Sequence, residues 1–177
     1  MKHPCKNDGC CKDVTKAPGY KCTCPPLLKR VRESDCAYDI AMNKDADQSS
    51  DYMGHKYLEV ARYAVDGDQG TLSKTLDLGE QWWRVDFGET MQFDEVTVVL
   101  ANADTPRRRL EKGKVLVSNA YDFQNHTLCH EFPSGGLPKA YSFRCRDNPT
   151  TARYLKIVPG QSGSLVLFDV LVYGWSL

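Results

Sequence analysis

Short stretches in which apolar and polar residues alternate dominate the second half of this 177-residue chain. A period of two places successive side chains on opposite faces of an extended strand, so each stretch can bury one face of a sheet. Turn-forming residues separate the stretches, and the helix-like segment 57–65 is short. The pattern favours an all-β sandwich or jelly roll over an α/β fold. The predicted strands are residues 94–100, 113–118, 140–145, 153–158 and 165–174.

The cysteines divide the chain into two parts of different composition. A segment as short as the first 36 residues cannot bury a core of its own and depends on disulfides. We therefore predict a cysteine-rich module at residues 1–36 and a sandwich domain at residues 37–177. This cysteine density is typical of secreted, extracellular proteins. Five of the eight cysteines lie in the first 24 residues: Cys5, Cys10, Cys11, Cys22 and Cys24.

Charge and hydropathy argue against several classes of function. The 23 basic residues balance the 23 acidic residues, so no net field draws the chain to nucleic acid or to an anionic membrane. No apolar run approaches the roughly 18 residues of a membrane span. The first residues lack an apolar signal segment, which indicates a mature form or a fragment. Because no nucleophile elbow, phosphate-binding glycine loop or metalloprotease helix is present, we predict that the chain is not an enzyme.

Two adjacent tryptophans, Trp82 and Trp83, stand in the stretch QWWRVDFG. In a strand they point to opposite faces, so one is predicted to lie in the core and the other to cover a loop or the rim. A sugar-stacking role for the outer ring is the alternative. Arg84 and Asp86 share a face and are predicted to pair, and Gly88 is predicted to end the strand.

The first 36 residues resemble an epidermal-growth-factor-like module. The resemblance is carried by Tyr20, Cys22 and Cys24, an aromatic residue before a Cys-x-Cys pair. It implies two disulfides, Cys5–Cys22 and Cys24–Cys36. It leaves Cys10 and Cys11 unassigned, because the first cysteine of such a module is missing here. The two form a vicinal bridge, one of them is free, or one pairs with another chain.

Residues 37–177 resemble the F-type lectins, the fucolectin-like group of discoidin-type domains. The resemblance implies a secreted jelly-roll sandwich with a calcium site and often a sugar site on one rim. It also implies a hairpin-closing disulfide between Cys129 and Cys145. By the loop-closure model, such a bridge adds about 3 kcal/mol to the free energy of unfolding. The motifs that agree in order and spacing are IAMNKDADQSS at 40–50, YAVDGD at 63–68, QWWRVDFG at 81–88, VTVVLANAD at 96–104 and LFDVLVYG at 167–174.

The same resemblance implies a Ca²⁺ site between an Asp-Gly-Asp turn and the last strand. Three carboxylates placed close together repel one another unless a cation joins them, and calcium prefers such oxygen ligands. A hydroxyl from Ser73 or a neighbour would complete the shell. The alternative is an ordinary turn with a solvated aspartate. The predicted metal ligands are Tyr63, Asp66, Asp68, Ser73, Phe168 and Asp169.

The sugar motif of the F-type lectins is only partly present, in the stretch NADTPRRRL. Asn102 replaces the first arginine of the motif, whereas Asp104 and Arg109 keep their positions. The motif's histidine is missing, and Thr105 and Pro106 replace its paired cysteines. Each lost charged hydrogen bond costs roughly 1.5–3 kcal/mol, which argues against ordinary fucose binding. We retain Asn102, Asp104 and Arg109 as the predicted ligand-binding residues.

The run of arginines at 107–109 can recognise sulfate or carboxylate groups, with a solvated charged loop as the alternative. We therefore predict an extracellular recognition or adhesion protein that binds a cell-surface or matrix glycan, or another extracellular protein. The alternative is a structural or adhesive component of the extracellular matrix that assembles as a homo-oligomer through protein contacts and disulfides. The Asn-His-Thr sequon predicts N-glycosylation at Asn125.

Overall fold

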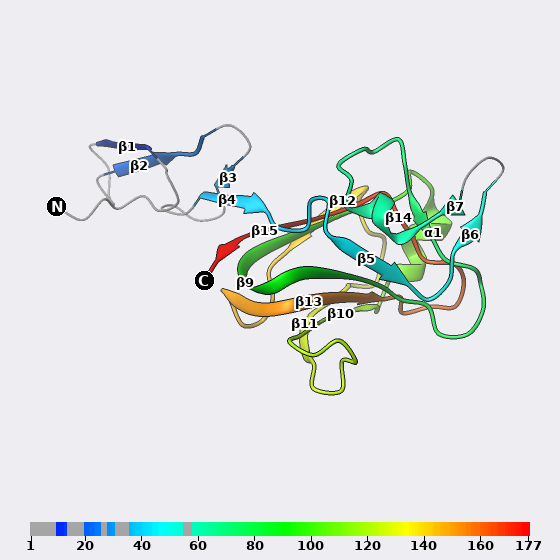
Figure 1. The fold of residues 1–177 in the computed structure, drawn as a ribbon. Coiled ribbons are helices and arrows are strands. Elements are labelled where there is room, and N and C mark those ends of the chain that lie inside the picture. Colours follow the sequence, from blue (N-terminus) through cyan, green and yellow to red (C-terminus); the bar gives the residue numbers. More distant parts are fainter. Residues whose placement is uncertain (1–9, 14–19, 26–27, 31–35, 55–57) are drawn as a thin grey trace.

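The computed structural model describes residues 10–13, 20–25, 28–30, 36–54 and 58–177. These residues form a β-sandwich with one short α-helix, as the alternating pattern predicts (Figure 1). The elements are β1 (Cys10–Asp13), β2 (Tyr20–Thr23), β3 (Lys29–Arg30), β4 (Cys36–Asp39), β5 (Asp45–Gln48), β6 (Tyr52–Met53), β7 (Leu58–Glu59), the 3₁₀ helix η1 (Ala61–Ala64), β8 (Ser73–Lys74), β9 (Trp83–Val99), α1 (Asp104–Leu110), β10 (Lys114–Ser118), β11 (Thr127–Glu131), β12 (Ala140–Phe143), β13 (Thr150–Val158), β14 (Val166–Leu167) and β15 (Asp169–Ser176).

The 17-residue strand β9 organises the sandwich. Its first part pairs with β5 and β13, and its last part pairs with β12 and β15. All of these pairings are antiparallel. The two ends of β9 therefore belong to different layers, and the bent strand links those layers into one continuous sheet path, β11-β10-β13-β9-β15-β4-β3.

Gly88 does not end this strand, contrary to the prediction, because β9 continues to Val99. Its φ is +89°, a value that glycine adopts without steric cost. The register with β13 shifts here, from Asp86 opposite Tyr154 to Met91 opposite Ala152. The glycine therefore marks a bulge, which bends a strand without interrupting it.

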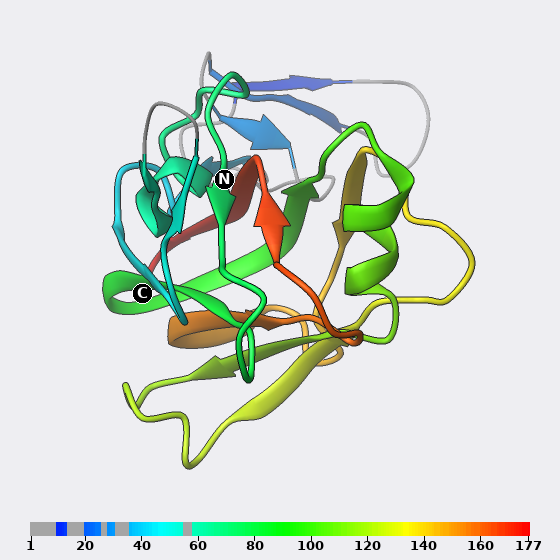
Figure 2. The ribbon, with the colours of Figure 1, turned by 90° about the vertical axis from the view of Figure 1, so that its right-hand side faces the viewer.

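The other predicted strands are present with shifted bounds. The helix-like segment 57–65 contains β7 and η1, and the predicted strand at 165–174 is divided into β14 and β15 at Phe168. Helix α1 lies at one end of the sandwich, beside the loop that leads to β12 (Figure 2). Among the residues that the structure describes, no helix is long and apolar enough to cross a membrane.

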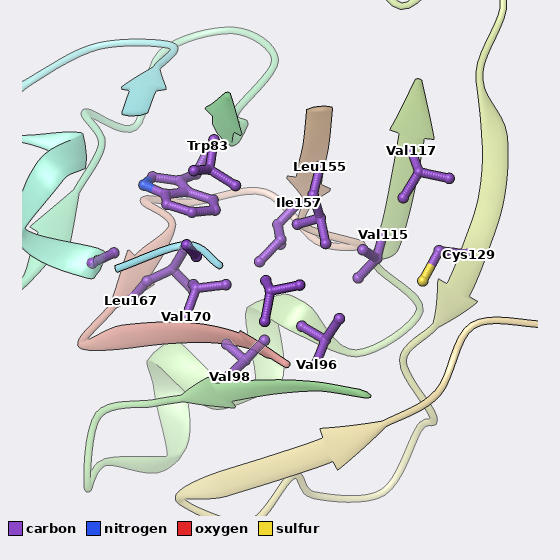
Figure 3. Packing of buried hydrophobic residues seen from close by; sticks show 14 of the residues in the cluster. Trp83, Val96, Val98, Val115, Val117, Cys129, Leu155, Ile157, Leu167 and Val170 are labelled. Atoms are coloured by element: carbon purple, nitrogen blue, oxygen red, sulfur yellow. The ribbon is translucent and has the colours of Figure 1, made fainter. Parts of the chain in front are cut away.

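Trp83 lies in the core and Trp82 lies on the opposite face, as the alternation predicts. The side chain of Trp83 is completely buried, and its indole N–H donates to the carbonyl oxygen of Ala61 at 2.9 Å. Trp83 belongs to a buried core that also contains aliphatic side chains from β9, β10, β13 and β15 (Figure 3). Trp82 is partly exposed.

The predicted pairing of Arg84 with Asp86 is wrong. Arg84 binds Asp47 at 2.8 Å, and Asp86 accepts two hydrogen bonds from Arg153, at 2.8 and 2.9 Å. Asp47 lies directly opposite Arg84 in the β5–β9 register. Facing residues on paired strands are closer than residues i and i+2 of one strand, so the partners come from the neighbouring strands.

The N-terminal part contains a hairpin of β1 and β2. The structure contains the Cys24–Cys36 disulfide and the Cys129–Cys145 disulfide. Cys22 is also disulfide-bonded, and its predicted partner Cys5 lies outside the described residues. Strand β4 begins at Cys36 and pairs with both β3 and β15, so the chain enters the main sheet at this strand.

Candidate functional site

A cluster of oxygen atoms lies at the turn that follows η1. The Thr71 hydroxyl oxygen is 2.8 Å from Oδ2 of Asp66, 2.8 Å from the main-chain oxygen of Asp68 and 3.4 Å from that of Tyr63. One hydroxyl has a single hydrogen to donate, so it cannot satisfy all three acceptors at once. We call Tyr63, Asp66, Asp68 and Thr71 the oxygen cluster. Its carboxylate, carbonyl and hydroxyl donors are the kinds that hard cations prefer.

The backbone of this turn is fixed by local hydrogen bonds. Asp66 Oδ1 accepts the N–H of Asp68 at 2.9 Å, and Asp68 Oδ1 accepts the N–H of Gly70 at 2.8 Å. Gly67 between the two aspartates has a φ of +73°, which permits the sharp bend. The turn therefore holds Asp66 in place while the carboxylate of Asp68 remains exposed.

Asp169, the first residue of β15, is electrostatically linked to this turn. Its side chain is only 3% exposed, and Oδ1 accepts the N–H of Val170 at 3.0 Å. Burial, the charge of Asp39 and the charge of Asp66 raise the pKa of Asp169 to about 6. The structure thus brings Asp66 and Asp169, which are remote in the sequence, within electrostatic range of each other, as the prediction requires.

Two features of the cluster differ from the predicted ligand set. The Ser73 hydroxyl is buried and donates to Gln48 Oε1 at 2.6 Å, so Thr71 supplies the hydroxyl of the oxygen cluster. Asp39, which we did not predict, lies near Asp169 because β4 pairs with β15. Burial also raises the pKa of Asp39, although N–H groups of Val172 and Ala41 donate to it.

In the described part of the chain, side-chain ligands alone do not form a metal centre. Within the described residues, no three His, Cys, Asp or Glu side chains are arranged so that they could hold an ion. Main-chain and hydroxyl oxygens supply most of the cluster. Phe168, the remaining predicted ligand, is partly exposed, and its N–H donates to the carbonyl oxygen of Val99 at 2.9 Å.

A second polar site, which we call the α1 groove, lies between α1 and the loop before β12. Its volume is 840 Å³. Arg107 donates to the Asp104 carboxylate at 2.5 Å and to the main-chain oxygen of Leu137 at 3.2 Å. The side chain of Arg107 therefore ties the two walls together. The lining residues are Asp104, Arg107, Arg108, Glu111, Gly135, Gly136, Leu137, Pro138 and Gln161.

Arg107 and Arg108 both line the α1 groove, whereas Arg109 is turned away from it, so the three arginines of α1 do not form one cationic patch. Arg109 donates to the main-chain oxygen of Ser164 at 3.0 Å. A Cβ atom at Gly163 would lie 2.4 Å from Arg109 Nε, so only glycine permits this approach. Of the predicted ligand-binding residues, Asp104 lines the groove, Asn102 is exposed in the preceding loop, and Arg109 is held by the loop before β14.

The sandwich and its polar rim define a galactose-binding-like domain of the lectin type. The chain belongs to the family of NedA-like, galactose-binding domains, whose model matches residues 63–157. The match includes the oxygen cluster and every lining residue of the α1 groove except Gln161. A comparison with curated protein sequences finds no significant match.

Solved structures of lectins share this fold. The fucolectin from striped bass (Morone saxatilis) serum is 27% identical with a TM-score of 0.64, over 78% of this chain and 48% of that one. The present chain thus spans about half of the bass protein. The lectin domain of lectinolysin, solved with Lewis B antigen, is 25% identical with a TM-score of 0.65, over 76% and 94% of the two chains. A Streptococcus pneumoniae fucose-binding module, 24% identical with a TM-score of 0.64 over 77% and 95%, shows the same fold.

Proposed function

We propose that this chain is an extracellular carbohydrate-recognition module whose rim loops are stabilised by a calcium ion. Membership in the galactose-binding family is the observation that carries the carbohydrate part. The likeness to a fucolectin and to a lectin domain bound to Lewis B antigen supports a cell-surface or matrix glycan as the ligand. The disulfides support an extracellular location, because such bonds persist in oxidising compartments.

The oxygen cluster and Asp169 fit a calcium ion by their chemistry. Asp66 and Asp169 would supply carboxylates, Thr71 a hydroxyl, and Tyr63 and Asp68 main-chain oxygens. Bound calcium would supply the positive charge that two neighbouring carboxylates need in order to remain ionised. The turn and β15 belong to distant parts of the sequence, so an ion shared between them would stabilise the rim.

The α1 groove is the proposed glycan site. Arg108 and Gln161 are exposed there, and Asp104 and Glu111 provide acceptors for sugar hydroxyls. The partly exposed guanidinium of Arg107 already binds Asp104 and so holds the groove. Arg108 is therefore the cation that remains to face a ligand. We expect a glycan other than simple fucose, because Asn102 replaces an arginine of the fucose motif and Arg109 is engaged by Ser164.

A glycan array probed with and without a calcium chelator tests this function. We expect a defined set of glycans to bind, with weaker binding in chelator. Arg108→Gln should reduce that binding about tenfold, the value of one charged contact. Arg146→Gln, which removes an exposed arginine outside the groove, should bind like the wild type. The proposal fails when no glycan binds under either condition.

One observation favours a structural or adhesive role in the matrix as a second candidate. The rim has lost donors of the sugar motif at Asn102, and the guanidinium of Arg109 is turned to the Ser164 carbonyl. In that role Cys10 and Cys11 would link subunits. Electrophoresis without reductant should then show covalent oligomers, and reductant should convert them to monomers. A monomeric band in both lanes would argue against covalent assembly.

A further inference from the structure

A second groove lies beside β9 and β13, and it shares Gln161 with the α1 groove. It has a volume of 330 Å³ and runs between the start of β9 and the loop after β13. This volume is at the lower end of the roughly 300–1,000 Å³ of known ligand pockets. We call it the Trp82 groove. Its lining residues are Gly79, Glu80, Gln81, Trp82, Lys156, Val158, Pro159, Gly160, Gln161 and Ser162.

The indole ring of Trp82 is held firmly in this groove. The Arg84 guanidinium lies 4.9 Å from the centre of the ring and 3.6 Å from that of Tyr121. Arg84 is itself fixed by Asp47 at 2.8 Å and by the main-chain oxygen of Tyr121 at 3.0 Å. Stacking of aromatic rings and cations in this way positions the indole without burying it. A partly exposed indole offers a sugar ring a flat apolar surface to stack on.

Lys156 adds a positive charge beside the same ring. Its ammonium lies 5.0 Å from the centre of the Trp82 ring and 5.4 Å from that of Phe123. In the described part of the chain, no carboxylate lies within ion-pair distance of it, whereas Arg84 and Arg153 each bind an aspartate. Lys156 also faces Arg84 across the β9–β13 pair. Like charges placed opposite each other are destabilising, so an anion bound at Lys156 would relieve this repulsion.

Polar groups complete the groove. The side chains of Gln161 and Ser162 are exposed on its far wall, and Glu80 is exposed at its edge. Amide and hydroxyl groups exchange hydrogen bonds with sugar hydroxyls.

The pKa of Lys156 reflects its place in the groove. Burial first, and then the charge of Arg84, lowers this pKa, while the charge of Glu80 raises it.

We propose that the Trp82 groove binds a saccharide that carries a carboxylate or sulfate group, with one sugar ring stacked on Trp82 and the anionic group at Lys156. Trp82 and Lys156, which define the site, do not line the α1 groove, and the two grooves share Gln161. It gives the domain two glycan-binding faces, one at the rim and one on the sheet.

Isothermal titration of the whole chain with three tetrasaccharides tests this proposal. Hyaluronan carries carboxylates, heparin carries sulfates as well, and cellotetraose is neutral. We expect an anionic tetrasaccharide to bind more tightly than cellotetraose, with an affinity that falls as salt is added. The stronger of the two anionic ligands identifies the preferred group. Equal binding of all three would overturn the assignment of an anionic ligand, and no binding of any would overturn the site.

Variants locate the binding. Trp82→Ala and Lys156→Gln should each weaken binding of the anionic tetrasaccharide about tenfold, and Trp82→Tyr should retain most of it because a ring remains. Lys74→Gln is the matched control, since the Lys74 ammonium lies 3.5 Å from the centre of the Tyr52 ring but outside the groove. Thermal melting checks that each variant is folded. Loss of binding in Arg108→Gln, with Trp82→Ala unchanged, would move the ligand to the α1 groove and overturn the proposal.

Discussion

At the scale of single residues, the carboxylate of Asp169 is costly to ionise in the folded protein and is also a proposed calcium ligand. A carboxylate that is 3% exposed and close to two other acids is costly to ionise, which is why its pKa rises to about 6. Without a cation, the folded protein binds more protons than the unfolded chain between pH 3.8 and about 6. The stability of the metal-free protein should therefore fall as pH rises through this window.

Asp169→Asn tests that reasoning. Because asparagine keeps an acceptor for the N–H of Val170 and removes the charge, the variant should be more stable than the wild type in chelator at pH 7, by at most about 3 kcal/mol. The advantage should vanish below pH 4. Urea unfolding at several pH values measures both effects. An unchanged or lower stability at pH 7 would show that the carboxylate is not strained.

The two neighbouring tryptophans should respond differently to the same substitution. Trp83→Phe leaves the Ala61 carbonyl without its indole donor and opens a cavity, so we expect a loss of about 1–3 kcal/mol. Trp82→Phe changes a partly exposed ring and should cost about 0.5 kcal/mol or less. Urea unfolding of both variants compares them directly. Equal losses would contradict the assignment of faces.

The metal-binding role of the predicted site residues stays a prediction, although the structure places Asp66 within electrostatic range of Asp169. The Asp-Gly-Asp turn indicated Asp66, and the last strand indicated Asp169. Thr71 was not singled out, because the length of the turn decides which hydroxyl reaches the cluster and Ser73 enters the β8–β14 pair instead. Asp39 depends on the pairing of β4 with β15, which no local pattern encodes.

At the scale of elements, the Cys129–Cys145 disulfide joins β11 to the segment after β12. The Cys129 carbonyl also accepts the N–H of Arg146 at 2.9 Å, so the bridge reinforces a contact that already exists. Replacing both cysteines with alanine should lower the free energy of unfolding by about 2–4 kcal/mol. Denaturant titration measures the loss. A loss below about 0.5 kcal/mol would mean that packing alone holds β11 in place.

The existence of six described strands, β9, β10, β12, β13, β14 and β15, could be predicted in whole or in part, whereas their partners could not. Alternation identifies a segment with one buried face, which is sufficient for β10, β12 and β13. The long strand β9 was predicted only in pieces, because the glycine at its bulge, Gly88, resembles the end of a strand in the sequence. The partners of Arg84 and Asp86 were not predicted, because cross-strand register is a property of the assembled sheet.

At the scale of the whole molecule, the cysteine-rich part is attached to the sandwich at several points. Lys29 binds Glu95 at 2.5 Å and lies 4.3 Å from the centre of the Tyr173 ring. Strand β4 continues from this part into the main sheet. The division into two domains near residue 36 stays a prediction, and β3 and β4, which lie on the two sides of it, pair with each other.

The proposed calcium ion should act on the whole sandwich, because its donors come from the turn at 63–71 and from β15. At a concentration one hundred times the dissociation constant, a bound ion adds about 2.7 kcal/mol to the free energy of unfolding. For a chain of this size, that corresponds to a rise in melting temperature of roughly 5–10 °C. Differential scanning calorimetry with calcium and with chelator measures the shift.

Asp66→Ala should abolish this shift, since it removes the cluster's carboxylate near Asp169. Asp122→Ala is the matched control: Asp122 Oδ1 accepts the N–H of Gln124 at 3.1 Å, just as Asp66 Oδ1 accepts that of Asp68, but it stands in an exposed loop elsewhere. The control should keep the full calcium response. If Asp66→Ala keeps the calcium response just as the control does, Asp66 is not a ligand of the ion and the proposed site is wrong.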